Sequence, residues 1–394
     1  MISERIGFIQ IAILSDPNFS RQNRTFVLYS LLIRNRLSII PKPIAVTKSP
    51  IKILFFSDTH LGFDLPIHPR IQRRRRGHDF FSNYHHILNI AQAKKVDLII
   101  HGGDVFFRSK VPPSIVEKAF EPLVEIANSG IPIYLVPGNH ERSKLPRHLW
   151  LAHRHIHVFD QPKTYRIRVG DAAIALSGFP FSRKVKRNFQ TLLHQTNYLE
   201  NKADTHFLCI HQTFEGAKVG PSDFTFRVDP DNIPGSEIPD GFTAILSGHI
   251  HRGQRLTHTL DHRPFTAPVI YSGSIERTSF AERFEGKYYV IIKVDPSFRN
   301  SIPIIEFHPL PTRPMVKIEI PTHDKHLDAI KNLIQENLSA LDPDSIVRIH
   351  ITGPNAEESL RSLSASYLRA LAPATMNISL AYQWNNGDKG PKAL

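Results

Sequence analysis

Short apolar runs alternate with amphipathic segments from Ile51 onward, and this pattern predicts the elements of the fold. Apolar runs rich in Ile, Val, Leu and Phe are typical of buried strands. Such runs occur at Ile51–Phe56, Asp97–His101, Ile131–Val136, Ala172–Leu176, Phe207–Ile210 and Ala244–Leu246. Helices are predicted over 79–95 and from Pro112-Pro113 to Gly130. Because strand–helix–strand alternation pairs strands in parallel with helices packed outside, we expect a layered α/β core.

The chain is richer in strands after Gly170, and it changes character again near residue 310. We expect a second sheet, stacked on the first, to hold strands at Tyr271–Gly273, Tyr288–Val294 and Ile304–Phe307. Prolines 303, 309, 311 and 314 indicate a linker, after which the order β-α-β-α-β is predicted. Its segments are Met315–Ile320, Leu327–Leu341, Ser345–Thr352, Glu357–Leu371 and Met376–Trp384. The predicted fold class is therefore α/β, a layered β-sandwich flanked by helices, with a small C-terminal α+β cap domain.

Three parts of the chain follow from this pattern: an N-terminal extension over residues 1–48, a large domain over 49–310 and the cap domain over 315–394. The extension has no clear role, because it has the pattern of neither a linker nor a domain. One hypothesis places the natural start near Val46, and the intact mass of the native protein would test it.

Composition limits the compartment and the partners. A single cysteine, Cys209, excludes intramolecular disulfides and a Cys-based metal cage, so we expect a cytoplasmic protein. The apolar stretch Gly7–Leu14 is too short to span a bilayer, so no membrane association is expected. The net charge of +13 favours a polyanionic partner such as DNA.

The basic surplus lies in the large central part of the chain. Residues 315–394 hold eight basic and nine acidic side chains, so the cap has no net attraction to phosphate. The densest basic run is Arg73, Arg74, Arg75 and Arg76. This run either follows a DNA backbone or forms a solvated face, and the sequence favours neither reading.

Five short polar motifs each stand where an apolar run ends. They are Ser57-Asp58-Thr59-His60, Gly102-Gly103-Asp104, Gly138-Asn139-His140-Glu141, His211 and Gly248-His249-Ile250-His251. Ligands bind at the carboxyl ends of strands in α/β sheets, so these motifs are expected to converge on one crevice. The i, i+2 spacing within the first and last motifs places both members of a pair on one side of an extended chain. Glycines before Asp104, Asn139 and His249 allow sharp turns.

The side chains of these motifs form a donor set with oxygen and nitrogen atoms and no thiolate. The candidate ligands are Asp58, His60, Asp104, Asn139, His211, His249 and His251. Such a set suits Mn, Fe or Zn better than an all-oxygen Ca or Mg site. Asp104 is central in the order, and its two carboxylate oxygens can bridge two cations. The alternative, polar residues satisfied within a core, does not account for five motifs in this order.

From Asp58 to His251 the motif set resembles the calcineurin-like metallophosphoesterase superfamily. The resemblance implies that Asp58, His60, Asp104 and His251 hold one divalent ion, and that Asp104, Asn139, His211 and His249 hold the other. It also implies that His140 protonates the leaving group or steadies the developing charge. Residues 49–310 would then be a phosphoesterase domain in which two cations clamp a phosphate for in-line displacement.

A narrower resemblance follows downstream. Tyr271–Arg277, Phe280-Ala281-Glu282 and Gly286-Lys287 resemble the region that closes the phosphoesterase domain of SbcD-type DNA repair nucleases, and Asp58–Gly62 fits the same family. This resemblance implies manganese-dependent exonuclease or endonuclease cleavage of DNA, a homodimer, and an SMC-like ATPase partner of the SbcC type. The chain departs from some branches at Phe107, where they carry a second catalytic histidine. The helical segment that docks the ATPase is also not expected before Leu394.

Two other functions stay open at this point. A phosphodiesterase or phosphatase for nucleotides or other small phosphoesters would share all five motifs. Its phosphatase version is weakened because Asp104-Val105-Phe106 lacks the Asp-Arg-Gly sequence of those enzymes. A non-catalytic DNA-binding scaffold would use the charge alone, but it would not need an intact ligand set or His140.

Overall fold

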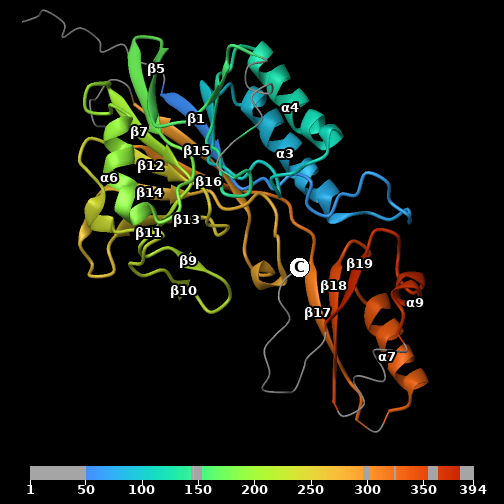
Figure 1. Ribbon diagram of the computed structural model, residues 1–394. Helices are drawn as coiled ribbons and strands as arrows, with labels where there is room; N and C mark the ends of the chain where they lie inside the picture. The colour runs from blue at the N-terminus through green and yellow to red at the C-terminus, as the bar shows by residue number, and fades with distance from the viewer. Residues whose placement is uncertain are drawn as a thin grey trace, which may run out of the picture. The chain divides into compact units, whose positions relative to one another are not determined.

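The structure is a computed structural model that describes residues 50–142, 145, 153–295, 302–323, 325–353 and 363–381. The predicted extension over 1–48, the start near Val46 and the end of the last predicted strand lie outside the described residues. Contacts divide the chain into Met1–Lys48 and Ser49–Leu394, and the second unit holds every element described below. Figure 1 shows its helices and strands.

Two six-stranded sheets form the core of the unit. The first has the order β16-β15-β1-β2-β3-β4 and the second the order β13-β14-β12-β7-β6-β5. The strands of the first are β1 (Ile51–Phe56), β2 (Leu98–His101), β3 (Ile133–Leu135), β4 (Ile156–Val158), β15 (Tyr288–Val294) and β16 (Ile304–Pro309). Those of the second are β5 (Lys163–Val169), β6 (Ala172–Gly178), β7 (Thr205–Ile210), β12 (Ala244–Ser247), β13 (Gln254–His258) and β14 (Pro264–Tyr271). Strands β1 to β4 pair in parallel, as the strand–helix alternation predicts.

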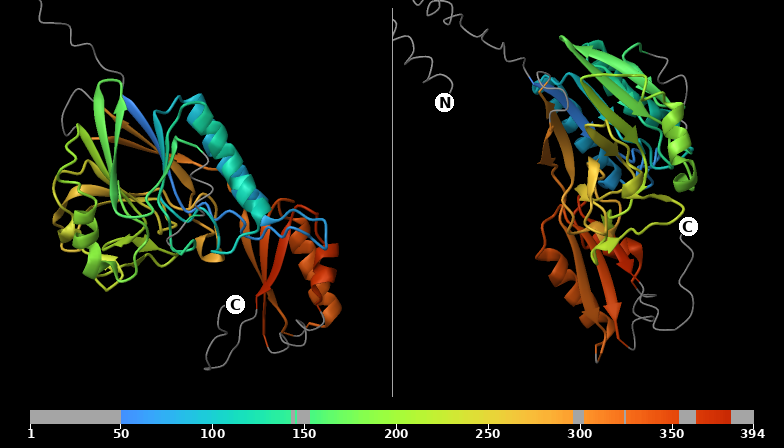
Figure 2. Two further views of the ribbon diagram at one scale, coloured as in Figure 1. Left: turned by 45° about the horizontal axis from the view of Figure 1, so that its top comes forward. Right: turned by 90° about the vertical axis from the view of Figure 1, so that its left-hand side faces the viewer.

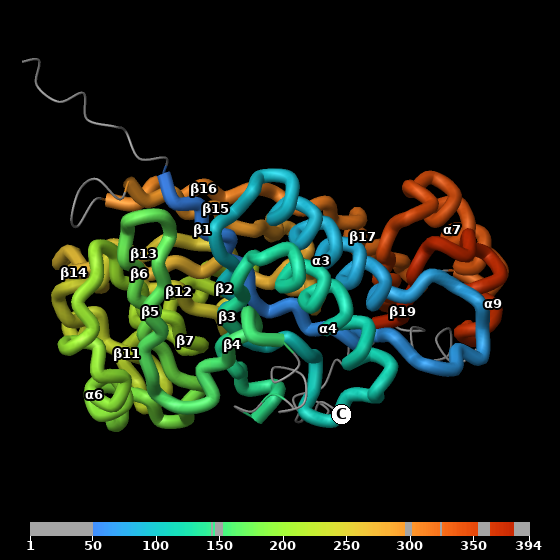
Figure 3. Tube along the Cα trace, turned by 90° about the horizontal axis from the view of Figure 1, so that it is seen from above, coloured from blue at the N-terminus to red at the C-terminus, as the bar shows by residue number. Residues whose placement is uncertain are grey.

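The two sheets share one apolar core, and helices cover their outer faces. Phe55 from β1 and Phe207 from β7 belong to the same buried cluster between the sheets. Helices α3 (Arg76–Ala93) and α4 (Pro113–Asn128) pack on the outer face of the first sheet. Helix α6 (Val185–Gln195) packs on the outer face of the second, so the helices lie on opposite sides of the sandwich (Figures 1 and 3). The prediction of a layered sandwich flanked by helices is confirmed.

The expected membership of the second sheet was wrong for two strands. Strand β15 pairs antiparallel with β1, with Ile292 opposite Ile53, and β16 pairs with β15, so both extend the first sheet. The physical reason is that β15 is buried on both faces: Val290 faces the core between the sheets and Ile291 faces the helices. A strand that is apolar on both faces does not indicate which of two stacked sheets it joins.

Residues 315–381 contain a third sheet. We call the described residues of this region the cap. Its strands β17 (Met315–Pro321), β18 (Ile346–Thr352) and β19 (Asn377–Ala381) pair in parallel in that order. Helices α7 (Leu327–Ser339) and α9 (Ala365–Ala370) connect them (Figure 2). Residues such as Ile334, Ile349 and Leu368 form a separate core. The domain boundaries at 49–310 and 315–394 stay a prediction.

Several short elements lie in the connections around the two large sheets. They are β8 (Thr213–Phe214), β9 (Lys218–Val219), β10 (Phe224–Thr225), β11 (Asn232–Ile233) and the 3-10 turns η1 (Gly235–Glu237) and η2 (Phe280–Glu282). No helix in the described ranges combines the length and apolar character that a membrane crossing requires.

Candidate metal centre

The seven predicted ligands lie on five loops, each of which follows the carboxyl end of a strand. The loops after β1, β2 and β3 carry Asp58 and His60, Asp104, and Asn139. The loops after β7 and β12 carry His211, and His249 with His251. Strands β1, β2 and β3 are neighbours in one sheet, and β7 and β12 are neighbours in the other. The site therefore forms where the carboxyl ends of the two sheets meet.

The loops turn through left-handed backbone at the ligands themselves. The φ angles are 53° at Asp58, 42° at His60, 54° at Asp104 and 83° at His249. The expectation that the i, i+2 pairs lie on an extended chain was therefore wrong, because the backbone turns at Asp58, His60 and His249. Non-glycine residues in this region cost about 1–3 kcal/mol each and persist where the surroundings hold them. Here the backbone N–H of His60 donates to the carbonyl oxygen of Asp104 at 3.0 Å, which ties two of the loops together.

The glycines before the ligands act in two ways. Gly103 has a φ of +110°, so it supplies the turn that was expected before Asp104. Gly138 and Gly248 instead allow close approach. A Cβ at Gly138 would lie 2.1 Å from Oδ1 of Asp104, and one at Gly248 would lie 2.3 Å from the carbonyl oxygen of Gly102. Larger residues at these two positions would push the loops apart.

The structure brings all seven predicted ligands together in two adjacent clusters. Potential ligand atoms lie within 4.8 Å of one another in the group Asp58, His60 and His251, and again in the group Asp104, His211 and His249. Oδ1 of Asn139 lies 3.0 Å from Nε2 of His211 and 2.9 Å from Nδ1 of His249.

Asp104 lies between the two clusters. It also forms a group with His60 and His140, so its carboxylate is close to members of both ligand sets. The pairing of ligands that the resemblance implies is compatible with this geometry.

Burial of the two carboxylates explains why cations fit here. Asp58 and Asp104 are fully buried, and burial raises the pKa of Asp58 although His211 and His251 oppose the effect. Burial also acts to raise the pKa of Asp104, but the proximity of His211 holds it well below its usual range. Positive charge beside two carboxylates this deeply buried stabilises them, because unpaired buried charge is costly. Divalent ions would add such charge.

The pKa values of the ligand histidines are shifted in different directions. Burial lowers the pKa of His60 well below its usual value and that of His249 to about 3, which favours the neutral form that coordinates metal. Burial would also lower the pKa of His211, but Asp104 raises it to about 9, so this ring carries a proton at neutral pH that a bound metal ion would displace. Carboxylate oxygens and imidazole nitrogens match a site for divalent transition metals.

Hydrogen bonds orient three of the rings. Nδ1 of His211 lies 2.8 Å from the carbonyl oxygen of Gly102, and Nδ1 of His140 lies 2.5 Å from that of Phe107. Nδ1 of His251 lies 3.2 Å from a carboxylate oxygen of Glu282. A ring that donates from Nδ1 keeps its Nε2 lone pair for the site, which is the usual arrangement behind metal-binding histidines.

Three residues support the site although the sequence pattern indicates no role for them: Glu141, Glu282 and Lys287. Glu141 accepts hydrogen bonds from the backbone N–H groups of Phe106 at 2.7 Å and Gly138 at 2.9 Å, so it joins two ligand-bearing loops. Burial raises its pKa to about 8. All three lie inside motifs that stand out in the sequence, so their positions could have drawn attention to them. The spacing of residues along the chain does not show which side chains contact each other in the fold.

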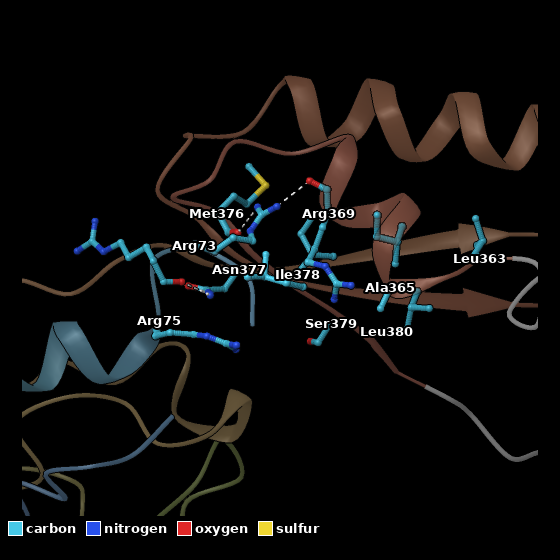
Figure 4. A pocket seen from close by; sticks show the side chains of 13 residues that line it. Arg73, Arg75, Leu363, Ala365, Arg369, Met376, Asn377, Ile378, Ser379 and Leu380 are labelled. Carbon is cyan, nitrogen blue, oxygen red and sulfur yellow. Dashed lines mark hydrogen bonds between the residues drawn. The ribbon is translucent and has the colours of Figure 1, made fainter. Parts of the chain in front are cut away.

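The four predicted DNA-contacting arginines do not share one environment. Arg73 donates to the carbonyl oxygens of Arg369 at 2.7 Å and Met376 at 3.0 Å, both in the cap (Figure 4). Arg74 pairs with Asp79 at 2.6 Å and with Asp344 at 3.1 Å.

The other two arginines differ from these and from each other. Arg76 donates to the carbonyl oxygen of Arg277. Among the described residues, the Arg75 side chain has one ion pair, 3.6 Å from Asp64, and it lines a pocket of about 390 Å³ beside the cap together with Arg73 and Arg369.

A family model for calcineurin-like phosphoesterases matches residues 51–253 of the chain. The DNA double-strand break repair protein Mre11 of Saccharolobus solfataricus is 27% identical over 299 residues, which cover 73% of this chain and 72% of that protein. Proteins of the same name from Methanosarcina mazei and Thermoplasma acidophilum are 25% and 27% identical over 78% and 50% of this chain. The chain spans about half the length of these two relatives. The match over more than half of the sequence, together with the site geometry, shows that the chain belongs to the calcineurin-like phosphoesterase family.

Proposed function

We propose that this protein is a metal-dependent DNA nuclease that hydrolyses phosphodiester bonds at a centre of two divalent ions. The observation that carries the proposal is the convergence of seven oxygen and nitrogen donors from five loops, beside a half-exposed histidine. Enzymes of the family use divalent ions, and the buried carboxylates Asp58 and Asp104 give these ions a reason to bind here.

Manganese is the proposed ion, with iron or zinc as alternatives. The donor set is rich in imidazole and contains no thiolate, and the one cysteine, Cys209, is buried in β7 among apolar side chains. Asp58, His60, Asp104 and His251 would hold one ion, and Asp104, Asn139, His211 and His249 the other. Bound ions would supply the positive charge that stabilises the attacking and leaving oxygens of an in-line displacement.

His140 is the proposed acid of the reaction. Its side chain is 34% exposed, so it can meet a substrate, and its Nε2 lies 3.8 Å from Oδ2 of Asp104. The Phe107 carbonyl accepts from Nδ1 and thereby directs Nε2 toward the cluster. An imidazole in this position can give a proton to the leaving oxygen or stabilise the charge that develops there.

DNA is the proposed substrate for three reasons. The relatives are named as DNA double-strand break repair proteins. The chain has a net charge of +13. Arg142 and Arg183 line, with Asn139 and Phe181, a pocket of about 480 Å³ next to the ligand cluster, where they can receive phosphates that flank the bond to be cut. Arg75, which lines a separate pocket beside the cap, is a further candidate for a phosphate contact.

The remaining expectations concern partners and location. A homodimer and an ATPase partner of the SbcC type are implied by the resemblance to SbcD-type nucleases, and a cytoplasmic location is expected from the single cysteine. These are proposals. The oligomeric state of the purified chain tests the homodimer, and co-purification of an ATPase tests the partner.

One experiment separates the proposed nuclease from its rivals. Purified protein with Mn²⁺ is incubated with end-labelled linear DNA and, in parallel, with a small bis-phosphodiester, and a His140→Ala variant is the control. Cleavage of DNA that is lost in the variant supports the nuclease. Cleavage of the small ester alone would favour an enzyme for nucleotides. Binding of DNA without cleavage of either substrate, at full metal occupancy, would favour a scaffold.

A further inference from the structure

A lysine is fully buried directly behind the metal centre. Nζ of Lys287 lies 2.6 Å from Oε2 of Glu282, 2.9 Å from Oγ of Ser274 and 3.0 Å from the carbonyl oxygen of His251. Its side chain has no exposed surface. An ammonium group in such a place is tolerated only because a carboxylate and further acceptors surround it.

The carboxylate that pairs with this lysine also contacts a proposed metal ligand. Oε2 of Glu282 accepts from Lys287, whereas Oε1 lies 3.2 Å from Nδ1 of His251. The hydroxyl of Thr278 donates to the same Oε1. Each carboxylate oxygen thus has its own partners, so the carboxylate plane is held in one orientation.

The segment that carries Glu282 is also held from the cap side. Phe280 in η2 packs against Met315 and Ile346 in a small buried cluster. The guanidinium of Arg348 in β18 lies 4.1 Å from the centre of the Phe280 ring. The backbone of η2 is therefore held between the cap strands and the ligand loop, which limits the movement available to Glu282.

We propose that Glu282 is a positioning residue of the metal centre: it holds Nδ1–H of His251 so that Nε2 faces the ion, and Lys287 holds Glu282 in place. The proposal rests on the metal centre of the proposed function. It explains why Phe280–Glu282 and Gly286-Lys287, far along the chain from the ligands, belong to the same functional unit. Carboxylates behind metal-binding histidines commonly change metal affinity by 10- to 100-fold when they are removed.

The test measures metal binding without any substrate. Metal-free protein is titrated with Mn²⁺ by calorimetry, and the wild type is compared with Glu282→Ala and Glu282→Gln. We expect one of the two sites to weaken by about 10- to 100-fold in Glu282→Ala. Glu282→Gln should lose less, because its amide oxygen can still accept from His251. Glu285→Ala is the matched control: Glu285 lies 3.5 Å from the same Nζ, but its carboxylate has no contact with His251 among the described residues.

A double variant separates positioning from folding. Glu282→Ala leaves Lys287 buried without its main partner, so Glu282→Ala/Lys287→Met removes both charges together. We expect the double variant to keep the far-ultraviolet circular dichroism of the wild type and still bind one ion weakly. Two sites of wild-type affinity in the folded double variant would overturn the proposal. Wild-type protein that binds no Mn²⁺ would instead overturn the metal centre itself.

Discussion

The backbone carbonyl of Phe107 accepts a hydrogen bond from Nδ1 of His140 at 2.5 Å. Phe107 occupies the position where some SbcD-type branches carry a second catalytic histidine, and here its backbone orients the first one instead. The His140 ring lies with its centre 4.7 Å from that of His60, at the exposed side of the cluster. Among the described residues outside the seven proposed ligands, His140 is therefore the imidazole placed for proton transfer at this side of the site.

Replacing His140 should separate catalysis from metal binding. His140→Gln removes the proton donor but none of the seven proposed ligands, so we expect the cleavage rate to fall about 10²- to 10⁴-fold with both metal sites intact. Single-turnover cleavage and elemental analysis of the same preparation measure the two quantities. A variant that lost its metal, or one that cut within tenfold of the wild-type rate, would contradict the assignment.

Replacing Asp104, in contrast, should weaken metal binding itself. Asp104→Asn replaces a carboxylate by a neutral amide. Among the described residues, Asp104 is the carboxylate that lies close to members of both ligand sets, so we expect the variant to retain at most one of two ions. Elemental analysis after dialysis measures the loss. Asp223→Asn is the control, because Asp223 is an exposed carboxylate that pairs with Arg252. If Asp104→Asn kept both ions, the bridging role would be wrong.

Much of the core and the candidate site could be predicted because apolar runs and polar motifs alternate in the chain. Strands β1, β2, β7 and β12 end directly before their motifs, and β3 ends at Leu135, shortly before Gly138, so the strand and the loop identify each other. The sheet that β15 joins was not predictable in this way. Its residues, such as Val290 and Ile291, are apolar on both faces, and either sheet would bury them.

Other features depend on which buried atoms face each other, which spacing does not show. The left-handed backbone at Asp58 and His60 is imposed by hydrogen bonds to the loop of Asp104, far away in the sequence. The pairing of Lys287 with Glu282 likewise depends on the fold of the loop between them. Four consecutive arginines were equivalent in the sequence, but the structure gives each one different partners.

Arg75 and Arg73 should therefore behave differently when replaced. Arg75→Ala removes a charge with one long ion pair, so we expect unchanged stability and a salt dependence of DNA affinity that is lower by about one unit of slope. Arg73→Ala removes hydrogen bonds to several carbonyl oxygens of the cap, so we expect a loss of about 1–3 kcal/mol in the free energy of unfolding. Binding titrations at several salt concentrations and urea denaturation measure these effects. An unchanged slope for Arg75→Ala would remove this residue from the DNA surface.

Glu276 should make the stability of the protein depend on pH. It is 3% exposed, and its Oε1 accepts from the backbone N–H of Arg277 at 2.7 Å. Burial raises its pKa to about 7, well above the value of about 4.3 expected in the unfolded chain. The folded protein therefore binds a proton more tightly than the unfolded chain does. The resulting stability is full below about pH 4.3 and is lost as the pH rises through about 7.

Glu276→Gln should remove this dependence, because the amide imitates the protonated carboxyl and does not ionise. The quantity to compare is the free energy of unfolding of the variant minus that of the wild type. We expect this difference to be larger at pH 8.5 than at pH 4.5 by on the order of 3 kcal/mol. Urea denaturation at both pH values measures the gain, with Glu121→Gln, an exposed carboxylate on α4, as the control. A gain of equal size at both pH values would mean that Glu276 does not change its ionisation on folding. In that case the Glu276 carboxylate stays ionised in the folded protein, because the positive charges of Arg76 and Arg277 lower its pKa and outweigh the effect of burial.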